Sequence, residues 1–279
     1  MATDQNSLQK PANPVAKKLA GLSAVVITLN SASTLRRCLQ SLCFAQEVIV
    51  LDGGSSDQTR AIALECGASF YENSDWKGFG VQKNRAIDLT KNEWILLLDS
   101  DEWFEPQAVD ELELTLRAGT HSDTAPVAFR FRRRSRYLGV IVRHSGWWPD
   151  YVTRLFRRDA ARYSEDWVHE RLVLNSSNQL GTLRSVIEHD AVVSVEQVLG
   201  KTNRYSTLSA QQMGAKGRRA SVGTAVGKGI WAFIRTFIFQ LGFLDGRVGF
   251  LIAFHSAETT FYRYLKLWES NLDKSRPSN

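Results

Sequence analysis

Two aspartates after an apolar stretch are the first residues in this sequence whose types and spacing could do chemistry. Asp99 and Asp101 stand two positions apart, directly after the apolar run 93–98. In an extended chain, side chains at i and i+2 point to the same side, so both carboxylates could address one hard cation. A Mg²⁺ or Mn²⁺ held by one or two carboxylates keeps open positions for a diphosphate. Asp-x-Asp alone is a weak signal, and its place at a strand end is what gives it weight.

A glycine-rich turn follows a second apolar run. The segment Asp52-Gly-Gly-Ser-Ser-Asp57 comes directly after residues 47–51. A tight turn followed by a helix cap explains these residues without any ligand. The segment lacks the Gly-x-Gly-x-x-Gly spacing of a nicotinamide dinucleotide loop, and the chain has no Gly-Lys-Ser/Thr phosphate loop. A nicotinamide site is therefore disfavoured.

The elements that must position these residues alternate between strands and helices. Apolar runs predict strands at 23–29, 47–51, 68–71 and 93–98, and three- and four-residue apolar spacing predicts helices at 35–42, 58–66 and 80–89 and another from Pro106. This rhythm predicts an α/β fold with a doubly wound sheet, whose strand-to-helix loops share one edge. We therefore expect five polar residues to meet at that edge: Asn30, Asp52, Asp57, Asp99 and Asp101. Beyond residue 126, short alternating stretches predict additional mixed or antiparallel strands, and the last quarter is helical and rich in aromatic residues.

Composition describes an ordinary folded protein. The chain has 279 residues, 43% of them hydrophobic and 23% charged, with 6 prolines, which excludes wholesale disorder and low-complexity sequence. Its three cysteines cannot build a disulfide framework, and we expect buried, reduced thiols. The first residues carry no apolar core of a signal peptide and predict a flexible tail over 1–22.

Four segments in order resemble the successive motifs of family 2 glycosyltransferases with the GT-A fold. They are Val25–Asn30, Val48–Asp57, Gly78–Ala86 and Trp94–Glu102. Three later segments, Gly146–Arg157, Val168–Leu172 and Gly242–Gly246, resemble the branch of that family that holds bacterial lipopolysaccharide-core beta-1,4-glucosyltransferases. Together they imply an inverting transfer of a hexose to a lipopolysaccharide-core or other glycolipid acceptor. Glucose is the hexose that this resemblance favours.

The resemblance also implies where the donor and the metal bind. The expected donor is a nucleotide sugar, with UDP-glucose favoured, and it would contact Asn30, Asp52, Lys83, Asn84, Arg85 and Asp99. A Mg²⁺ or Mn²⁺ ion would lie at Asp99 and Asp101. The sequence departs from the family pattern at two places. Ser31 and Ala32 stand where an acidic residue commonly follows Asn30, and Gly53 replaces a side chain that is often polar. We divide the chain into a nucleotide-sugar-binding half (23–125), an acceptor and catalytic half (126–219) and a membrane-associating helical region (220–279).

An inverting transfer needs a base that takes the proton of the acceptor hydroxyl. Residues 164–170 are the segment beyond the donor half that concentrates carboxylates with a histidine. We predict Asp166 as the base and Glu170 as the second candidate. Alternatively, Glu165 and Glu170 pair with nearby arginines on a solvated face. His169 is a candidate metal or phosphate ligand, or equally a structural histidine.

Charge is distributed unevenly along the chain. Residues 1–125 carry 11 Lys and Arg against 17 Asp and Glu, residues 126–219 carry 17 against 8, and residues 220–279 carry 7 against 4. The densest basic run lies at 130–143, and no nucleic-acid-binding module accompanies it, so we expect no nucleic acid partner. Arginine forks suit acceptor phosphates, which makes Arg143 a candidate acceptor contact. Trp147 and Trp148 could stack on a sugar ring or pack in the core.

The apolar stretch 230–254 is interrupted by Arg235, Gln240 and the sequence Asp245-Gly-Arg247. A membrane-spanning helix needs about 20 largely uncharged residues, so an interfacial contact with a membrane surface fits better. A buried helical pair is the alternative. We expect a cytoplasmic protein that is peripheral at the inner face of the bacterial inner membrane. The competing functions are a nucleotidyltransferase and a non-catalytic basic α/β protein that binds nucleic acid or anionic lipid.

Overall fold

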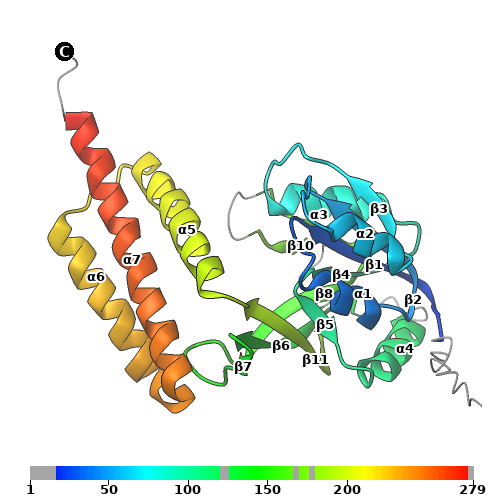
Figure 1. Ribbon diagram of the computed structural model, residues 1–279. Coiled ribbons are helices and arrows are strands. Elements are labelled where there is room, and N and C mark those ends of the chain that lie inside the picture. The colour runs from blue at the N-terminus through cyan, green and yellow to red at the C-terminus, as the bar shows by residue number, and fades with distance from the viewer. Residues whose placement is uncertain (1–16, 120–125, 166–169, 176–179, 276–279) are drawn as a thin grey trace, which may run out of the picture. The chain divides into compact units, whose positions relative to one another are not determined.

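The computed structural model describes residues 17–119, 126–165, 170–175 and 180–275 (Figure 1). The chain forms two compact units, and each is assembled from several segments. The first unit holds Met1–Ser100, Leu112–Ala128 and Leu155–Gln179, and the second holds Asp101–Glu111, Phe129–Arg154 and Leu180–Asn279. The division falls inside helix α4 (Ala108–Gly119) and inside strand β8 (Asp150–Arg157). It also falls between Ser100 and Asp101 and directly after Ala128, the first residue of β6.

The first unit is built on parallel strands joined by helices. Its elements are β1 (Leu19–Thr28), α1 (Leu35–Ser41), β2 (Ala45–Asp52), α2 (Thr59–Glu65), β3 (Ser69–Glu72), α3 (Phe79–Asp88), β4 (Trp94–Asp99), β9 (Ala161–Tyr163) and β10 (Leu172–Leu174). The strands lie in the order β3-β2-β1-β4, all parallel, and the end of β8 pairs antiparallel with β4. β9 and β10 form a separate antiparallel pair.

The core of the first unit explains why these runs become central strands. Most β-branched and leucine side chains on β1, β2 and β4 are buried, as expected for parallel strands covered on both faces. The predicted strands and helices of this half are confirmed, with their ends shifted by a few residues. Two local expectations are wrong: Cys43 is exposed rather than buried, and the chain turns at Ser100 and Asp101 instead of staying extended.

The second unit combines antiparallel strands with a helical region. Its elements are β5 (Glu102–Phe104), β6 (Ala128–Tyr137), β7 (Val140–Ile141), β11 (Leu180–Val192), α5 (Val195–Ala215), α6 (Val222–Ile234) and α7 (Gly246–Ser275). β11 lies between β6 and β5, and β7 pairs with β6. A π-helical turn (Arg235–Phe239) and a 3₁₀ turn (Gly242–Asp245) connect α6 to α7. The three long helices run side by side (Figure 1), which confirms the helical C-terminal region.

Candidate functional site

The carboxyl ends of β1, β2 and β4 line up at one edge of the first unit. Thr28 pairs with Asp52 between β1 and β2, and Ile27 pairs with Asp99 between β1 and β4. This register follows from burying three apolar runs of similar length side by side. It brings the loop that carries Asn30, the turn that carries Asp52, and Asp99 to the same edge, as the alternating pattern predicted.

Asp52 organises the glycine-rich turn that follows it. The residue is 1% exposed, and one carboxylate oxygen accepts the backbone N–H groups of Gly54 and Ser55. The other oxygen accepts the hydroxyls of Thr28 and Ser55. Four hydrogen bonds satisfy this buried carboxylate, so its structural work is to shape the turn. Its predicted contact with a donor stays a prediction.

Asn30 and Asp57 fasten the first loop to this turn. The Asn30 side-chain oxygen accepts the backbone N–H of Ser56, and Asp57 accepts the backbone N–H groups of Ala32 and Thr59. Burial raises the pKa of the Asp57 carboxyl, but hydrogen bonds from Thr59 and Ala32 outweigh it and leave that pKa below its usual value. The two loops at this edge therefore form one connected surface.

Lys83 lies at the centre of a charged cluster on α3. The side chain is 4% exposed, and its ammonium nitrogen lies 2.9 Å from a Glu170 carboxylate oxygen and 3.4 Å from an Asp99 carboxylate oxygen. It also lies 5.0 Å from the centre of the Tyr163 ring. A buried ammonium needs such partners. Glu170 therefore pairs with Lys83, and not with a neighbouring arginine on a solvated face.

Two neighbours of Lys83 hold other segments of the first unit. The Asn84 amide donates to the Tyr163 carbonyl and accepts the Tyr163 N–H, both at 2.9 Å, as a neighbouring β-strand would. Arg85 pairs with Asp75 at 2.8 Å and reaches Asn73. Both side chains are occupied by the protein itself, and their predicted donor contacts stay predictions.

Gly80 allows the segment after β9 to lie directly against α3. A Cβ atom at this position would fall 1.9 Å from the Ser164 carbonyl oxygen. Ser164 in turn exchanges two hydrogen bonds with Arg171: its backbone N–H donates to the Arg171 carbonyl, and its hydroxyl accepts the Arg171 N–H. Ser164 and Arg171 are thus held together, and Ser164 lies against α3.

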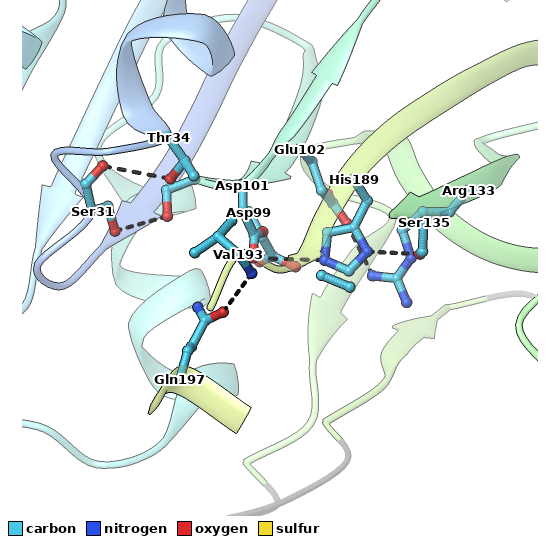
Figure 2. A network of polar contacts seen from close by, with 12 residues as sticks. Ser31, Thr34, Asp99, Asp101, Glu102, Arg133, Ser135, His189, Val193 and Gln197 are labelled. Atoms are coloured by element: carbon cyan, nitrogen blue, oxygen red, sulfur yellow. Dashed lines mark hydrogen bonds and ion pairs between the residues drawn. The ribbon is translucent and has the colours of Figure 1, made fainter. Parts of the chain in front are cut away.

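Asp101, in the second unit, faces a histidine that sequence reasoning missed. The His189 Nε2 atom lies 3.6 Å from an Asp101 carboxylate oxygen, and its Nδ1 atom lies 2.9 Å from the Ser135 hydroxyl (Figure 2). His189 is on β11, which pairs with β5 directly after Asp101. In the sequence, the only signal for His189 is its position next to Asp190 in an apolar stretch. His169 was selected instead because it lies among carboxylates.

The Asp101 and His189 pair fits a divalent cation. A separation of 3.6 Å is longer than a hydrogen bond and is close to the ~3 Å between adjacent ligands of an octahedral ion bound at ~2.1 Å. The bond to Ser135 fixes the imidazole ring, as partners of metal-binding histidines do. Among the residues that the structure describes, no group of three or more His, Cys, Asp or Glu side chains gathers. A cation here would complete its coordination with water or substrate.

Comparison with known proteins decides the family. Residues 23–176, more than half of the chain, match the model described as glycosyl transferase family 2. The chain belongs to glycosyltransferase family 2. It is 30% identical over 267 residues to the lipopolysaccharide core biosynthesis glycosyltransferase LpsC of Rhizobium meliloti (strain 1021), covering 92% of this chain and 95% of that one. It is 29% identical over 270 residues to an uncharacterized glycosyltransferase of Rickettsia bellii (strain RML369-C), covering 90% and 87%.

Solved structures of low sequence identity are similar over much of the chain. TarS of S. aureus (residues 1–349) matches at 14% identity and a TM-score of 0.43, covering 92% of this chain and 93% of that chain. Glucosyl-3-phosphoglycerate synthase from Mycobacterium tuberculosis, in complex with Mg²⁺ and UDP, matches at 16% identity and a TM-score of 0.45, covering 72% and 80%. The observed mixed sheet with its connecting helices confirms the expected α/β class, and membership of the family makes the protein a glycosyltransferase.

In this family 2 glycosyltransferase, much of the basic run is neutralised inside the second unit. Glu102, fully buried, pairs with Arg133 at 3.0 Å and Arg154 at 2.7 Å. Glu188, 1% exposed, pairs with Arg134 and Arg136. These ion pairs connect β5 and β11, the strands next to Asp101 and carrying His189, with β6 and β8. Burial lowers the pKa of Arg133, but the charges of Glu102 and Asp150 outweigh it and raise that pKa.

The predicted acceptor residues lie in and beside the loop between β7 and β8. The backbone N–H of Arg143 donates to Asp245 while its side chain is exposed. Trp147 packs edge-on against Tyr137, with ring centres 6.2 Å apart, so it contributes to the core. The Arg132 guanidinium lies 5.7 Å from the centre of the Trp148 ring. Asp166 and His169 lie outside the described residues.

Proposed function

We propose that this enzyme transfers a hexose, with inversion, from a nucleotide-diphosphate sugar to a lipopolysaccharide-core or similar glycolipid acceptor. UDP-glucose is the first donor to test. Membership of family 2 and the similarity to LpsC over nearly the whole of both chains support this substrate class. The observation that carries the chemistry is the convergence of Asp101 and His189 directly after the Asp99-Ser-Asp101 sequence.

Asp101 and His189 would hold Mg²⁺ or Mn²⁺. When bound, such an ion offsets the charge that develops on the departing diphosphate. Asp99 has a different task, because its carboxylate is paired with the buried Lys83 ammonium. That ion pair holds the end of β4 against α3. Of the metal ligands predicted from the sequence, we therefore retain Asp101, assign Asp99 to the lysine cluster and add His189.

Asp166 is our proposed base. Glu170 is the weaker candidate, because its carboxylate is already engaged with Lys83 at 2.9 Å. The described residues on both sides of Asp166 are anchored on α3, Ser164 through its contact with Gly80 and Glu170 through Lys83. Proton transfer requires the base to come within hydrogen-bond distance of the acceptor hydroxyl.

Product analysis tests the reaction. The purified protein is incubated with a panel of UDP-sugars, Mn²⁺ or Mg²⁺ and a lipopolysaccharide-core acceptor, and we expect UDP and glycosylated acceptor in equal amounts. The anomeric configuration of the product decides between inversion and retention. Release of pyrophosphate instead of UDP, or retention, would contradict the proposal.

Two variants test the assigned roles. Asp166→Asn should lower turnover by about 10²–10⁴-fold with donor affinity nearly unchanged, and Glu165→Gln, directly after Ser164 in the same segment, is the matched control. Asp101→Asn or His189→Gln should weaken Mn²⁺ binding, measured directly by electron paramagnetic resonance, in the presence of UDP. Unchanged Mn²⁺ binding in both metal-site variants would refute the assignment of this pair.

The cellular location stays part of the proposal. An acceptor anchored in lipid requires the enzyme to reach a membrane, and we place it as a peripheral protein at the cytoplasmic face of the inner membrane. Fractionation of cells tests this: the protein should sediment with inner membranes, be released only in part by high salt, and be extracted by carbonate.

A further inference from the structure

An apolar surface remains exposed where α6 passes into α7. We call it the hairpin surface, and it covers residues 230–254. Its large side chains include Phe239 at 67% exposure, Trp231 at 53% and Phe243 at 48%. The other exposed apolar residues there are Ile230, Ile238, Leu241, Leu244, Phe250 and Phe254. Some of these rings are direct neighbours, with ring centres 5.7 Å apart for Trp231 and Phe239 and 6.5 Å apart for Phe250 and Phe254. Large exposed apolar patches mark interaction sites.

The hairpin surface is a built structure and not a frayed end. Gly249 packs against the backbone of the 3₁₀ turn, where a Cβ atom would fall 1.8 Å from the Gly242 carbonyl oxygen. Phe237 lies half-buried among Phe233, Phe243 and Phe250, with ring centres 5.5 to 6.4 Å apart. Phe237 thus packs against the exposed Phe243 and Phe250 rings and against Phe233. Burial of the whole stretch in a core, one alternative from the sequence, is therefore excluded for Trp231 and Phe239.

The charges around the hairpin surface favour one kind of partner. Between residues 216 and 257 the chain carries six Lys and Arg residues and a single acid, Asp245. The Asp245 side chain is 6% exposed, because it accepts hydrogen bonds from the 143–145 segment. Lys228, Arg235 and Arg247 are exposed beside the aromatic rings. Exposed aromatic side chains with flanking basic groups are the pattern of a surface that enters the interface of an anionic bilayer.

The same aspartate connects the hairpin surface to the predicted acceptor loop. Asp245 accepts the backbone N–H groups of Arg143 and His144 and the Ser145 hydroxyl at 3.0 to 3.1 Å. The Ser145 N–H donates to the Gln240 carbonyl at 2.8 Å. All these residues belong to the second unit. A loop fastened at both turns of the hairpin moves with it.

We propose that the hairpin surface docks into the interfacial layer of an anionic phospholipid membrane and, through Asp245, holds the 143–148 loop at the membrane surface. The docking itself is independent of the proposed function, whereas its use, presentation of that loop to a lipid-borne acceptor, rests on it. One described helical stretch, Val222–Phe239, is long and apolar enough to cross a membrane. It carries Lys228 and Arg235, which suits an interfacial position better than a spanning one.

Vesicle sedimentation tests the docking. The full chain is mixed with vesicles of phosphatidylglycerol and phosphatidylethanolamine, or of phosphatidylcholine alone, at low and high salt. We expect binding to the anionic vesicles that weakens in salt without vanishing. The combined variant Trp231→Ser, Phe239→Ser, Phe243→Ser should bind at least about tenfold more weakly. Failure of the wild-type protein to bind anionic vesicles would overturn the proposal.

The matched control removes equally exposed apolar side chains elsewhere. Leu64, Leu114 and Leu199 are 53%, 69% and 53% exposed, and their combined change to serine should leave vesicle binding unchanged. Equal loss in both variants would refute the assignment to the hairpin surface. A hairpin variant that is monomeric when the wild type is a dimer, with no vesicle binding by either, would assign the surface to a second copy of this chain.

Two further measurements separate insertion, spanning and folding failure. Quenching of tryptophan fluorescence by brominated lipids should fall in Trp231→Phe, a variant that conserves the apolar ring and should still fold and bind. Unchanged quenching would show that this residue does not enter the bilayer. Resistance of the membrane-bound protein to carbonate extraction would overturn the interfacial position in favour of a spanning helix.

The connection through Asp245 has its own test. Asp245→Asn should keep vesicle binding and hydrolysis of the free donor, and should raise the KM for a lipid-borne acceptor by at least about tenfold, because removing a charged hydrogen-bond acceptor loosens the loop. Normal KM would refute the connection while leaving the docking intact. Loss of donor hydrolysis would instead reveal general misfolding and contradict the assigned role.

Discussion

Replacing Gly80 with alanine tests the link between α3 and the predicted catalytic loop. The new Cβ atom would lie 1.9 Å from the Ser164 carbonyl oxygen, and real Cβ contacts essentially never fall below 3.0 Å, so the two groups must separate by about 1.1 Å. The neighbour is backbone, which cannot rotate away as a flexible side chain would. Ser164 is two residues before Asp166, so the loop carrying the proposed base must shift with it.

A displacement of about 1 Å at a catalytic group can cost about 10²-fold in rate. We therefore expect Gly80→Ala to lower kcat for sugar transfer by about two orders of magnitude while UDP affinity, measured by calorimetry, changes little. If helix propensity were the only effect, Gly80→Ala would stabilise the protein, because alanine is favoured over glycine in a helix by about 1 kcal/mol.

Gly200→Ala is the matched control for this change. Gly200 is also helical, and a Cβ atom there would meet no other atom within 4 Å. We expect wild-type activity and equal or higher stability in urea unfolding. Gly80→Ala with wild-type kcat, in a protein as stable as the control, would refute the reasoning that this glycine positions the loop.

Three other changes test the charged and polar contacts. Lys83→Met removes the cation that Glu170 and Asp99 share and should lower the free energy of unfolding by about 3–5 kcal/mol, measured by urea titration. An unchanged value would contradict the stabilising role of these ion pairs. Asn84→Ala leaves the Tyr163 backbone groups unpaired and should cost about 1–3 kcal/mol in the same assay, and a loss below 0.5 kcal/mol, by the same principle, would show that water replaces the amide. Burial lowers the pKa of His255 below 6.5, against a smaller opposing effect of Glu258, so the unfolded chain binds the proton more readily. Stability should be full above pH 6.5 and fall as the pH drops below it, and His255→Phe should flatten this dependence between pH 7.5 and 5.

The sequence by itself determined the architecture of the first unit. Residues 23–29, 47–51 and 93–98 are apolar runs too short for buried helices, and a polar residue directly follows each. Parallel strands buried on both faces need such runs, and their connections place the following loops at one edge. The shared edge of Asn30, Asp52 and Asp99 was therefore predictable, as was the family, because four motifs in order constrain it more than any single one.

Only the tertiary structure decided which side chains work together. His189 lies 88 residues after Asp101, and nothing local in the sequence marks it as the partner; the pairing of β11 with β5 brings them together. The basic run looked like an anion-binding surface, yet buried Glu102 and Glu188 pair with four of the arginines in and after it.

The exposure of the aromatic helices was likewise a tertiary matter. The sequence of an apolar helical pair does not show whether the pair faces a protein core or a membrane interface, because composition and period are identical in both cases. The exposure of Trp231 and Phe239 in the folded protein separates the two cases. Local periodicity fixes elements, whereas contacts across long separations in the chain depend on the register of strands and the packing of helices, which no short stretch of sequence encodes.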